Sequence, residues 1–185
     1  MLQYYDAEIM MEESEAASFL KSNLEKEEVL TEIIRSISNP KKSEFTKYCI
    51  TNNEIVFKMV YIANALLKEF ENENLKNQIL DLIFSKNIIS VFFELFSEEN
   101  VSLQNRSLLE LQCSYFKDFF LDNLLPSRRP QLLEFLSSRS SDNSYPLQSM
   151  FRFLHNGDIT QIIISLLNSE GKNYYLFYLF TFHLF

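Results

Sequence analysis

The chain has 185 residues, of which 46% are hydrophobic, 15% aromatic and 23% charged, and this composition is that of a globular protein rather than a disordered one. Only two glycines and four prolines occur. Loops that hold phosphate through backbone amides need several glycines, and tight hairpin turns favour glycine too, so nucleotide-binding α/β folds and many-stranded sandwiches are disfavoured. An all-α chain remains.

The net charge of −8 is concentrated at the N-terminus, because residues 1–34 contain nine carboxylates against two lysines, a net charge of −7. The nearly neutral remainder lacks the basic surface that nucleic-acid binding requires. We interpret the acidic segment either as a solvated helix face or as a patch that meets a basic partner surface.

Apolar residues recur at helical spacing along almost the whole chain. The first stripe, over 20–37, predicts a helix that ends at Asn39-Pro40, because the residue before a proline is pushed out of the helical region. After a short segment over 41–50, we expect Asn52-Asn53 to cap a helix that contains the stripe 55–70. Two further stripes predict helices over 75–83 and 88–96.

A longer helix is predicted over 103–125, ended by Pro126, and the next over 128–138. The side chains of the second helix that we expect to face inward are Leu132, Leu133, Phe135 and Leu136.

The last predicted helices follow a loop-like stretch at 137–145. Pro146 suits a helix start, since its missing N–H has no intrahelical partner there. We expect Gly157 to end that helix in the left-handed conformation, and Asp158 to cap a helix over 159–167.

About eleven short helices with short links predict an α-solenoid of helical hairpins, HEAT- or armadillo-like, in which each pair buries its apolar face on the next. A compact helical bundle is the alternative. We expect an acidic N-terminal helix at 1–22, a helical-repeat domain at 23–170 and an aromatic C-terminal tail at 171–185. The tail is too short to span a bilayer and is interpreted as a buried last element, a truncated or atypical end, or a membrane contact.

The sequence contains little that suggests catalysis. Cys49 and Cys113 lie among apolar residues at helical spacing and are expected to be small buried side chains. His155 and His183 lack a neighbouring nucleophile or carboxylate pattern, and metal-ligand spacings are absent. We therefore predict a non-enzymatic chain without metal or cofactor. The N-terminus lacks the features of a signal peptide, so we expect the protein to be cytoplasmic.

The most informative polar feature is the pair Arg128-Arg129, with Lys117 upstream and Arg139 and Arg152 downstream. Arginine binds carboxylates through two parallel hydrogen bonds and is enriched at interface hot spots. The alternative is that these are solvated arginines at a helix start, paired to nearby carboxylates. The aromatic residues just before them, Tyr115, Phe116, Phe119 and Phe120, are expected in the core rather than on a docking surface.

Several segments together resemble one family. Residues 24–32 resemble its acidic domain start, and Ser43-Glu44-Phe45 resembles a following "x-E-F" helix. Residues 108–117 match an "LL…SxFxK" helix, and 128–136 match an "R-K/R-x-x-Q" turn followed by an "xxFL" helix. Residues 158–167 resemble an isoleucine- and leucine-rich helix. The family is the SAPS-domain family of phosphatase-associated proteins, regulatory subunits of protein phosphatase 6.

The resemblance implies a non-catalytic scaffold that binds a type-2A-like serine/threonine phosphatase catalytic subunit and directs it to substrates. It implies Tyr115, Lys117, Arg128 and Arg129 as contacts to that partner. Family members continue well beyond this length, so we expect the chain to be the N-terminal part of a longer array. Two alternatives stay open: a helical-repeat adaptor for an unrelated protein partner, and a structural subunit held in a larger assembly through the aromatic tail.

Overall fold

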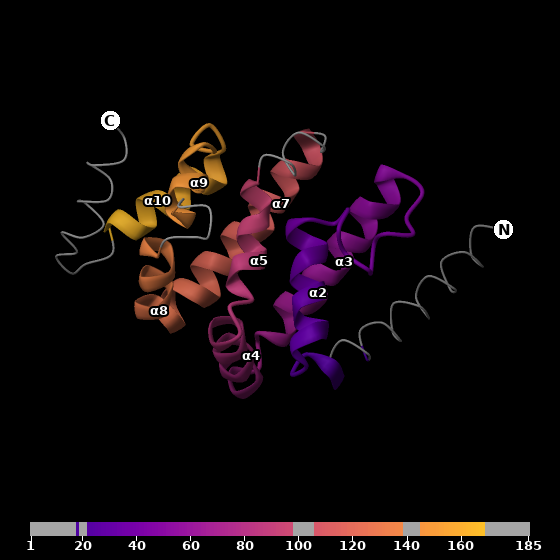
Figure 1. The fold of residues 1–185 in the computed structure, drawn as a ribbon, viewed down its shortest axis with the longest axis horizontal. Helices are drawn as coiled ribbons and strands as arrows, with labels where there is room; N and C mark the ends of the chain where they lie inside the picture. Colours follow the sequence, from indigo (N-terminus) through magenta and orange to yellow (C-terminus); the bar gives the residue numbers. More distant parts are fainter. Residues whose placement is uncertain (1–17, 19–21, 98–105, 139–144, 169–185) are drawn as a thin grey trace. The chain divides into compact units, whose positions relative to one another are not determined.

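The computed structural model describes residue 18 and residues 22–97, 106–138 and 145–168, which form helices and turns and, within these ranges, no strand (Figure 1). The all-α prediction is therefore confirmed for this part of the chain. The chain forms two compact units, Met1–Val91 and Phe92–Phe185. The predicted acidic helix at 1–22, apart from Ser18 and Ser22, and the tail at 171–185 lie outside the described residues.

In the first unit, α2 (Glu27–Ser38) packs on α3 (Asn52–Glu69). The face of α2 that meets the core consists of Leu30, Ile33, Ile34 and Ile37. The face of α3 that does so consists of Ile55, Met59, Ile62, Ala63 and Leu66. As predicted, α2 ends before Pro40, and the N–H of Asn39 closes it by donating to the carbonyl of Arg35 at 2.8 Å.

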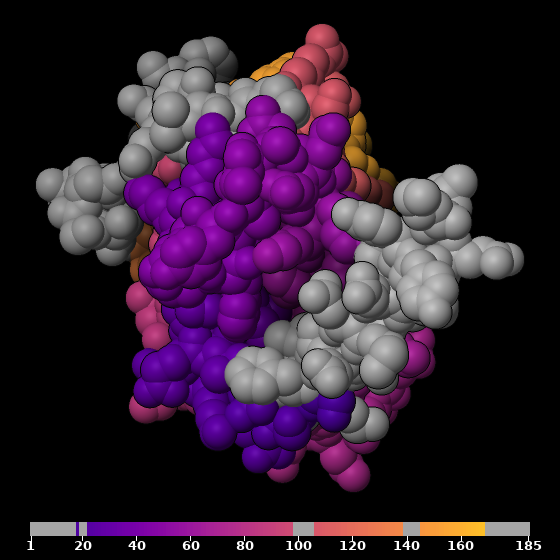
Figure 2. Space-filling model, turned by 90° about the vertical axis from the view of Figure 1, so that its right-hand side faces the viewer, coloured from indigo at the N-terminus to yellow at the C-terminus, as the bar shows by residue number. Residues whose placement is uncertain are grey.

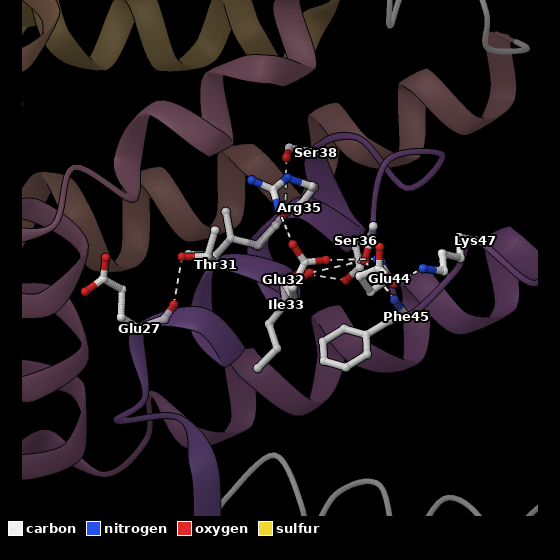
Figure 3. A network of polar contacts seen from close by, with 12 residues as sticks. Glu27, Thr31, Glu32, Ile33, Arg35, Ser36, Ser38, Glu44, Phe45 and Lys47 are labelled. Carbon is white, nitrogen blue, oxygen red and sulfur yellow. Dashed lines mark hydrogen bonds and ion pairs between the residues drawn. The ribbon is translucent and has the colours of Figure 1, made fainter.

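The segment between these helices is a set of turns, so the helix expected at Ser43-Glu44-Phe45 is wrong. Side chains hold the backbone in this shape (Figure 3). The Glu32 carboxylate accepts the N–H of Glu44 at 2.9 Å, and the Ser43 hydroxyl accepts the N–H of Phe45 at 3.2 Å. Glu32 also pairs with Arg35 on its own helix. Side-chain oxygens thus accept the backbone donors of these turns.

Thr51, and not Asn52-Asn53, caps α3. Its hydroxyl accepts the N–H of Glu54 at 3.2 Å, and the Glu54 carboxylate accepts the N–H of Thr51 at 2.8 Å. This reciprocal pair is a capping box, whose sequence signature is Thr or Ser followed three residues later by Glu.

The first unit continues with α4 (Glu73–Ser85), which Asn72 caps by accepting the N–H groups of Asn74 and Leu75. Asn87, after its end, has φ 55°, the left-handed conformation that asparagine adopts more readily than most residues. The next helix, α5 (Ile89–Phe93), crosses the boundary between the units and leads into the 3₁₀ turn η1 (Glu94–Phe96).

The second unit contains the helix that Pro126 was expected to end, and the break between it and the next helix lies two residues later than predicted. From α7 (Arg106–Phe119) the chain passes through one π-helical turn, η2 (Phe120–Leu124), into α8 (Leu125–Ser137). Pro126 is the second residue of α8 and directly follows the π-helical turn η2, so the helical backbone continues past it. The helical backbone breaks instead at Arg128 (φ −138°, ψ 36°), shortly before Pro130, whose ring crowds the preceding turn.

The last described helices are α9 (Pro146–Phe151) and α10 (Gly157–Asn168), and Pro146 begins α9 as predicted. Gly157 does not end a helix in the left-handed conformation; it is the first residue of α10. Asn156, rather than Asp158, caps α10, because its side-chain oxygen accepts the N–H groups of Asp158 at 3.0 Å and Ile159 at 3.2 Å.

Aromatic side chains form the centre of the second unit. Phe116 packs edge-on against Phe96, with ring centroids 5.1 Å apart, and Phe92 stacks on Phe119 at 4.6 Å. Phe116, Phe119 and Phe120 are buried, as predicted. In α8, Leu132 and Leu136 are buried, whereas Leu133 and Phe135 are only half-buried.

Candidate functional site

Lys117 lies on α7 and is held by two carboxylates. Its Nζ lies 3.0 Å from Asp158 Oδ1 in the first turn of α10 and 3.3 Å from Asp118 Oδ1. The hydrogen bond to Asp158 is the main cause that raises the pKa of Lys117, and partial burial opposes it. The side chain is 22% exposed. Lys117 is thus a cation already engaged within the chain, and it ties α7 to α10.

Arg128 and Arg129 lie at the break in α8, and both are half-buried. Arg128 Nη1 donates to the carbonyl of Ser127 at 2.9 Å. Both arginines have interactions within the chain, so neither is a fully solvated charge. Each guanidinium carries five N–H donors in a planar, forked arrangement.

Tyr115 is half-buried on α7, next to the buried Phe116. All four predicted site residues therefore belong to the second unit, on two helices joined directly through η2. Sequence reasoning missed the partner of Lys117. Asp158 was expected to cap α10, and its carboxylate pairs with Lys117 instead. Because these two residues are 41 positions apart, no local pattern identifies the pair.

Cys113 is a buried thiol on α7, as predicted, and Cys49 is half-buried, so its expected burial is only partly confirmed. Burial, with a smaller effect from Asp158 and Glu110, raises the pKa of the Cys113 thiol to about 12. The thiolate form that acts as a nucleophile is therefore strongly disfavoured at neutral pH. His155 is exposed and lies against Phe153, with ring centroids 6.0 Å apart. Among the residues that the structure describes, no group of three or more His, Cys, Asp or Glu side chains is placed to hold a metal ion.

A second surface, in the first unit, escaped the sequence analysis. Tyr48, Ile50 and Phe57 are 80%, 91% and 54% exposed. Glu54 lies among them, and accepting the N–H groups of Thr51 and Ile50 lowers the pKa of its carboxyl. Phe57 lies off the buried stripe of α3, and Tyr48 and Ile50 belong to the turn before that helix.

The family models, curated proteins and solved structures to which the chain was compared contain no match. Over the described part of the chain, no helix combines the length and the apolar character that crossing a membrane would require.

Proposed function

We propose that the chain is a non-catalytic regulatory or scaffold subunit that binds a type-2A-like, protein phosphatase 6-type serine/threonine phosphatase catalytic subunit and directs it to substrates. The basis of the proposal is the resemblance of several segments to the SAPS-domain family. The proposed array is an α-solenoid of short hairpins, and the packing of α2 on α3, adjacent in the chain, is compatible with it.

One observation carries the proposal: three of the resembling segments belong to the same unit, and two of them are in direct contact. The segment with Lys117 lies on α7, and the segment with Asp158 begins α10. Their ion pair, at 3.0 Å, joins these segments. The third, with Arg128 and Arg129, follows α7 through η2.

The proposed contact residues differ in how they would act. Arg128 and Arg129 have the chemistry of an interface hot spot, since a guanidinium binds carboxylates in a fixed two-pronged geometry. Tyr115 would add a rigid aromatic surface with a hydroxyl at its end. Lys117, already bound to Asp158, would mainly hold the surface in shape.

The direct test is binding of the purified full chain to a purified phosphatase 6-type catalytic subunit, measured by biolayer interferometry. We expect a one-to-one complex, and we expect the double variant Arg128→Gln/Arg129→Gln to weaken it by roughly 10-fold or more. The matched control is Arg106→Gln. Arg106 lies on the same unit, is 91% exposed and pairs with Glu110, and its replacement should leave the affinity unchanged.

A chain that binds no phosphatase catalytic subunit, while it captures other proteins reproducibly, would replace the proposal by the adaptor for an unrelated partner. If the complex forms and its affinity is unchanged in both Arg128→Gln/Arg129→Gln and Arg106→Gln, the proposed function stands. The contact surface must then lie elsewhere than Arg128 and Arg129.

A further inference from the structure

Helix α10 is apolar on two sides, and one of them is buried in the second unit. The helix contacts α7 and η2 (Figure 1). Its buried residues are Ile159, Ile162, Ile163 and Leu166. On another side of the same helix, Ile164 and Leu167 are 49% and 47% exposed, and residues three positions apart share a helix face. A helix that is apolar on more than one side is normally covered on each of them.

This second side of α10 extends to the turn that precedes the helix. Leu154 in that turn is 43% exposed. The Thr160 hydroxyl donates to the carbonyl of Leu154 at 2.8 Å, and Thr160 lies one helical turn before Ile164. The bond therefore holds the backbone of Leu154 beside this side of the helix. We name Leu154, Thr160, Ile164 and Leu167 the open α10 face.

The open α10 face is suited to an apolar occupant without charge. Residues 159–168 contain no Asp, Glu, Lys or Arg. Oppositely charged patches that would steer a charged partner onto this stretch of α10 are therefore missing from its own sequence. An occupant of matching chemistry is a segment of Leu, Phe and Tyr residues.

The chain carries such a segment directly after α10. Residues 174–185 are twelve residues long, as α10 is, and ten of them are Leu, Phe or Tyr while none is Asp, Glu, Lys or Arg. The link from α10 to this segment, residues 169–173, is Ser-Glu-Gly-Lys-Asn. Links between neighbouring packed elements usually have about 2–8 residues. The length of the link therefore lets the segment return along α10.

We propose that residues 174–185 pack on the open α10 face of the same chain. Three half-exposed apolar side chains offer less than the surface of about 800 Å² per partner that a stable interface between separate proteins buries. A short link raises the effective concentration of the occupant to roughly the millimolar range, so a contact of this size forms within one molecule. The segment thereby shields this side of α10 from solvent.

The first test is hydrogen–deuterium exchange of the full chain, followed by mass spectrometry of the peptide that contains residues 174–185. We expect the amides of this peptide to be protected in the wild type. Ile164→Gln/Leu167→Gln should raise their exchange rate about 10-fold or more, because the apolar contact that opposes opening is lost. Glutamine favours helix about as well as leucine, so α10 itself should persist.

The matched control is Ile50→Gln/Phe57→Gln, which also replaces two exposed apolar residues by glutamine. These residues belong to the first unit, whose indigo-to-purple part forms the front of the space-filling view (Figure 2). The control should leave the exchange of residues 174–185 unchanged. Ile164→Leu/Leu167→Met keeps the face apolar and should retain the protection. In all variants, the exchange of α7 amides reports whether the second unit remains folded.

The second test distinguishes packing within one chain from packing between two. The chain contains no tryptophan, so Phe180→Trp introduces a single fluorescent reporter into the segment. We expect its emission at shorter wavelength than in the Ile164→Gln/Leu167→Gln background. The spectrum should not change between about 1 and about 100 µM, a range below the effective concentration that the link provides.

Three results would overturn the proposal. Fast exchange of residues 174–185 in the wild type would show that the segment packs on nothing. Protection that Ile164→Gln/Leu167→Gln leaves intact, or that the control lowers equally, would place the segment elsewhere. Protection that grows with concentration, together with a doubled mass in light scattering, would assign the face to a second copy of the chain. None of these measurements involves a phosphatase, so they test the inference independently of the proposed function.

Discussion

Lys117 and Asp158 are 41 residues apart in the chain and 3.0 Å apart in space. Their ion pair joins the last turn of α7 to the first turn of α10. The carboxylate also lies at the positive end of the α10 dipole, where a negative charge is favourable by itself. The contribution of the pair to stability is therefore separable from that of Asp158 alone only by a double-mutant cycle.

We expect Lys117→Met and Asp158→Asn each to lower the free energy of unfolding, the second by slightly more because it also removes the dipole interaction. The double variant should lose less than the sum, with a coupling free energy of about 0.5–1 kcal/mol for a pair that is partly solvated. Urea denaturation followed by circular dichroism gives the free energy of unfolding of the wild type, the two single variants and the double variant. Strict additivity would mean that the pair contributes nothing to stability.

The same pair makes stability depend on pH at the alkaline end. The folded-state pKa of Lys117 is raised above the unfolded value, chiefly by the hydrogen bond to Asp158. Its contribution is therefore complete below the unfolded pKa and is lost as the pH rises through the folded pKa. We expect the free energy of unfolding of the wild type to fall between about pH 9.5 and pH 11.5, and to fall less in Lys117→Met. Lys68→Met, which removes an exposed lysine elsewhere, serves as the matched control.

The capping box at the start of α3 gives a prediction for the first unit. Thr51→Val removes the hydroxyl that accepts the N–H of Glu54 and should cost about 1 kcal/mol of unfolding free energy. Thr51→Ser keeps the acceptor and should cost much less. If the two variants are equally destabilised, the loss arises from packing rather than from the cap.

The acid limb of the stability profile should involve Glu54. Its pKa is lowered, first by the hydrogen bond from the Thr51 N–H and then by that from Ile50. The stabilisation is present above the unfolded pKa and is lost as the pH falls through the lower, folded pKa. We expect Glu54→Gln to show a weaker loss of stability than the wild type as the pH falls from about 5 to about 3. An unchanged profile in this variant would exclude Glu54 as a contributor.

Local chemistry explains which parts of the fold could be predicted. The end of α2 before Pro40 follows from the restriction that proline places on the preceding residue. The cap at Thr51 also had a local signature, Thr followed three residues later by Glu, which the choice of Asn52-Asn53 overlooked. At Ser43-Glu44-Phe45 turns replace the expected helix, and the Glu32 carboxylate, twelve positions away, accepts the N–H of Glu44 there.

The residues that matter for binding were harder to predict, because their environment depends on tertiary structure. The basic pair Arg128-Arg129 could be found in the sequence itself, but the break in α8 at Arg128 could not, since Pro126 was the more obvious helix stop. Ile50 is strongly apolar, yet it lies in the turn before α3 and is 91% exposed. Periodicity assigns residues to a face and cannot tell which face a later element covers.

The aromatic core of the second unit should be sensitive to the loss of a single ring. Phe116 is 2% exposed and contacts the rings of Phe92, Phe93, Phe96 and Phe120. Phe116→Ala should cost about 3–5 kcal/mol and Phe116→Leu markedly less. The control Phe57→Ala removes the same side chain from an exposed position and should cost little. Thermal unfolding of Phe116→Ala, Phe116→Leu and Phe57→Ala measures these differences in stability. Equal losses in the three variants would mean that Phe116 is loosely packed.

Thiol labelling gives a test of burial at two residues of the same type. Cys113 is buried, and burial raises the pKa of its thiol to about 12, so at pH 8 it presents almost no thiolate and little access. Cys49 is half-buried in the turn before α3. In the native chain we expect Ellman's reagent to modify Cys49 and to leave Cys113 unreacted, and both to react in guanidinium chloride. Cys49→Ser should then be unreactive when native and release one equivalent when unfolded. Fast native labelling of that variant would contradict the packing of α7 against α10, because Cys113 lies on α7, the helix that Lys117 ties to α10.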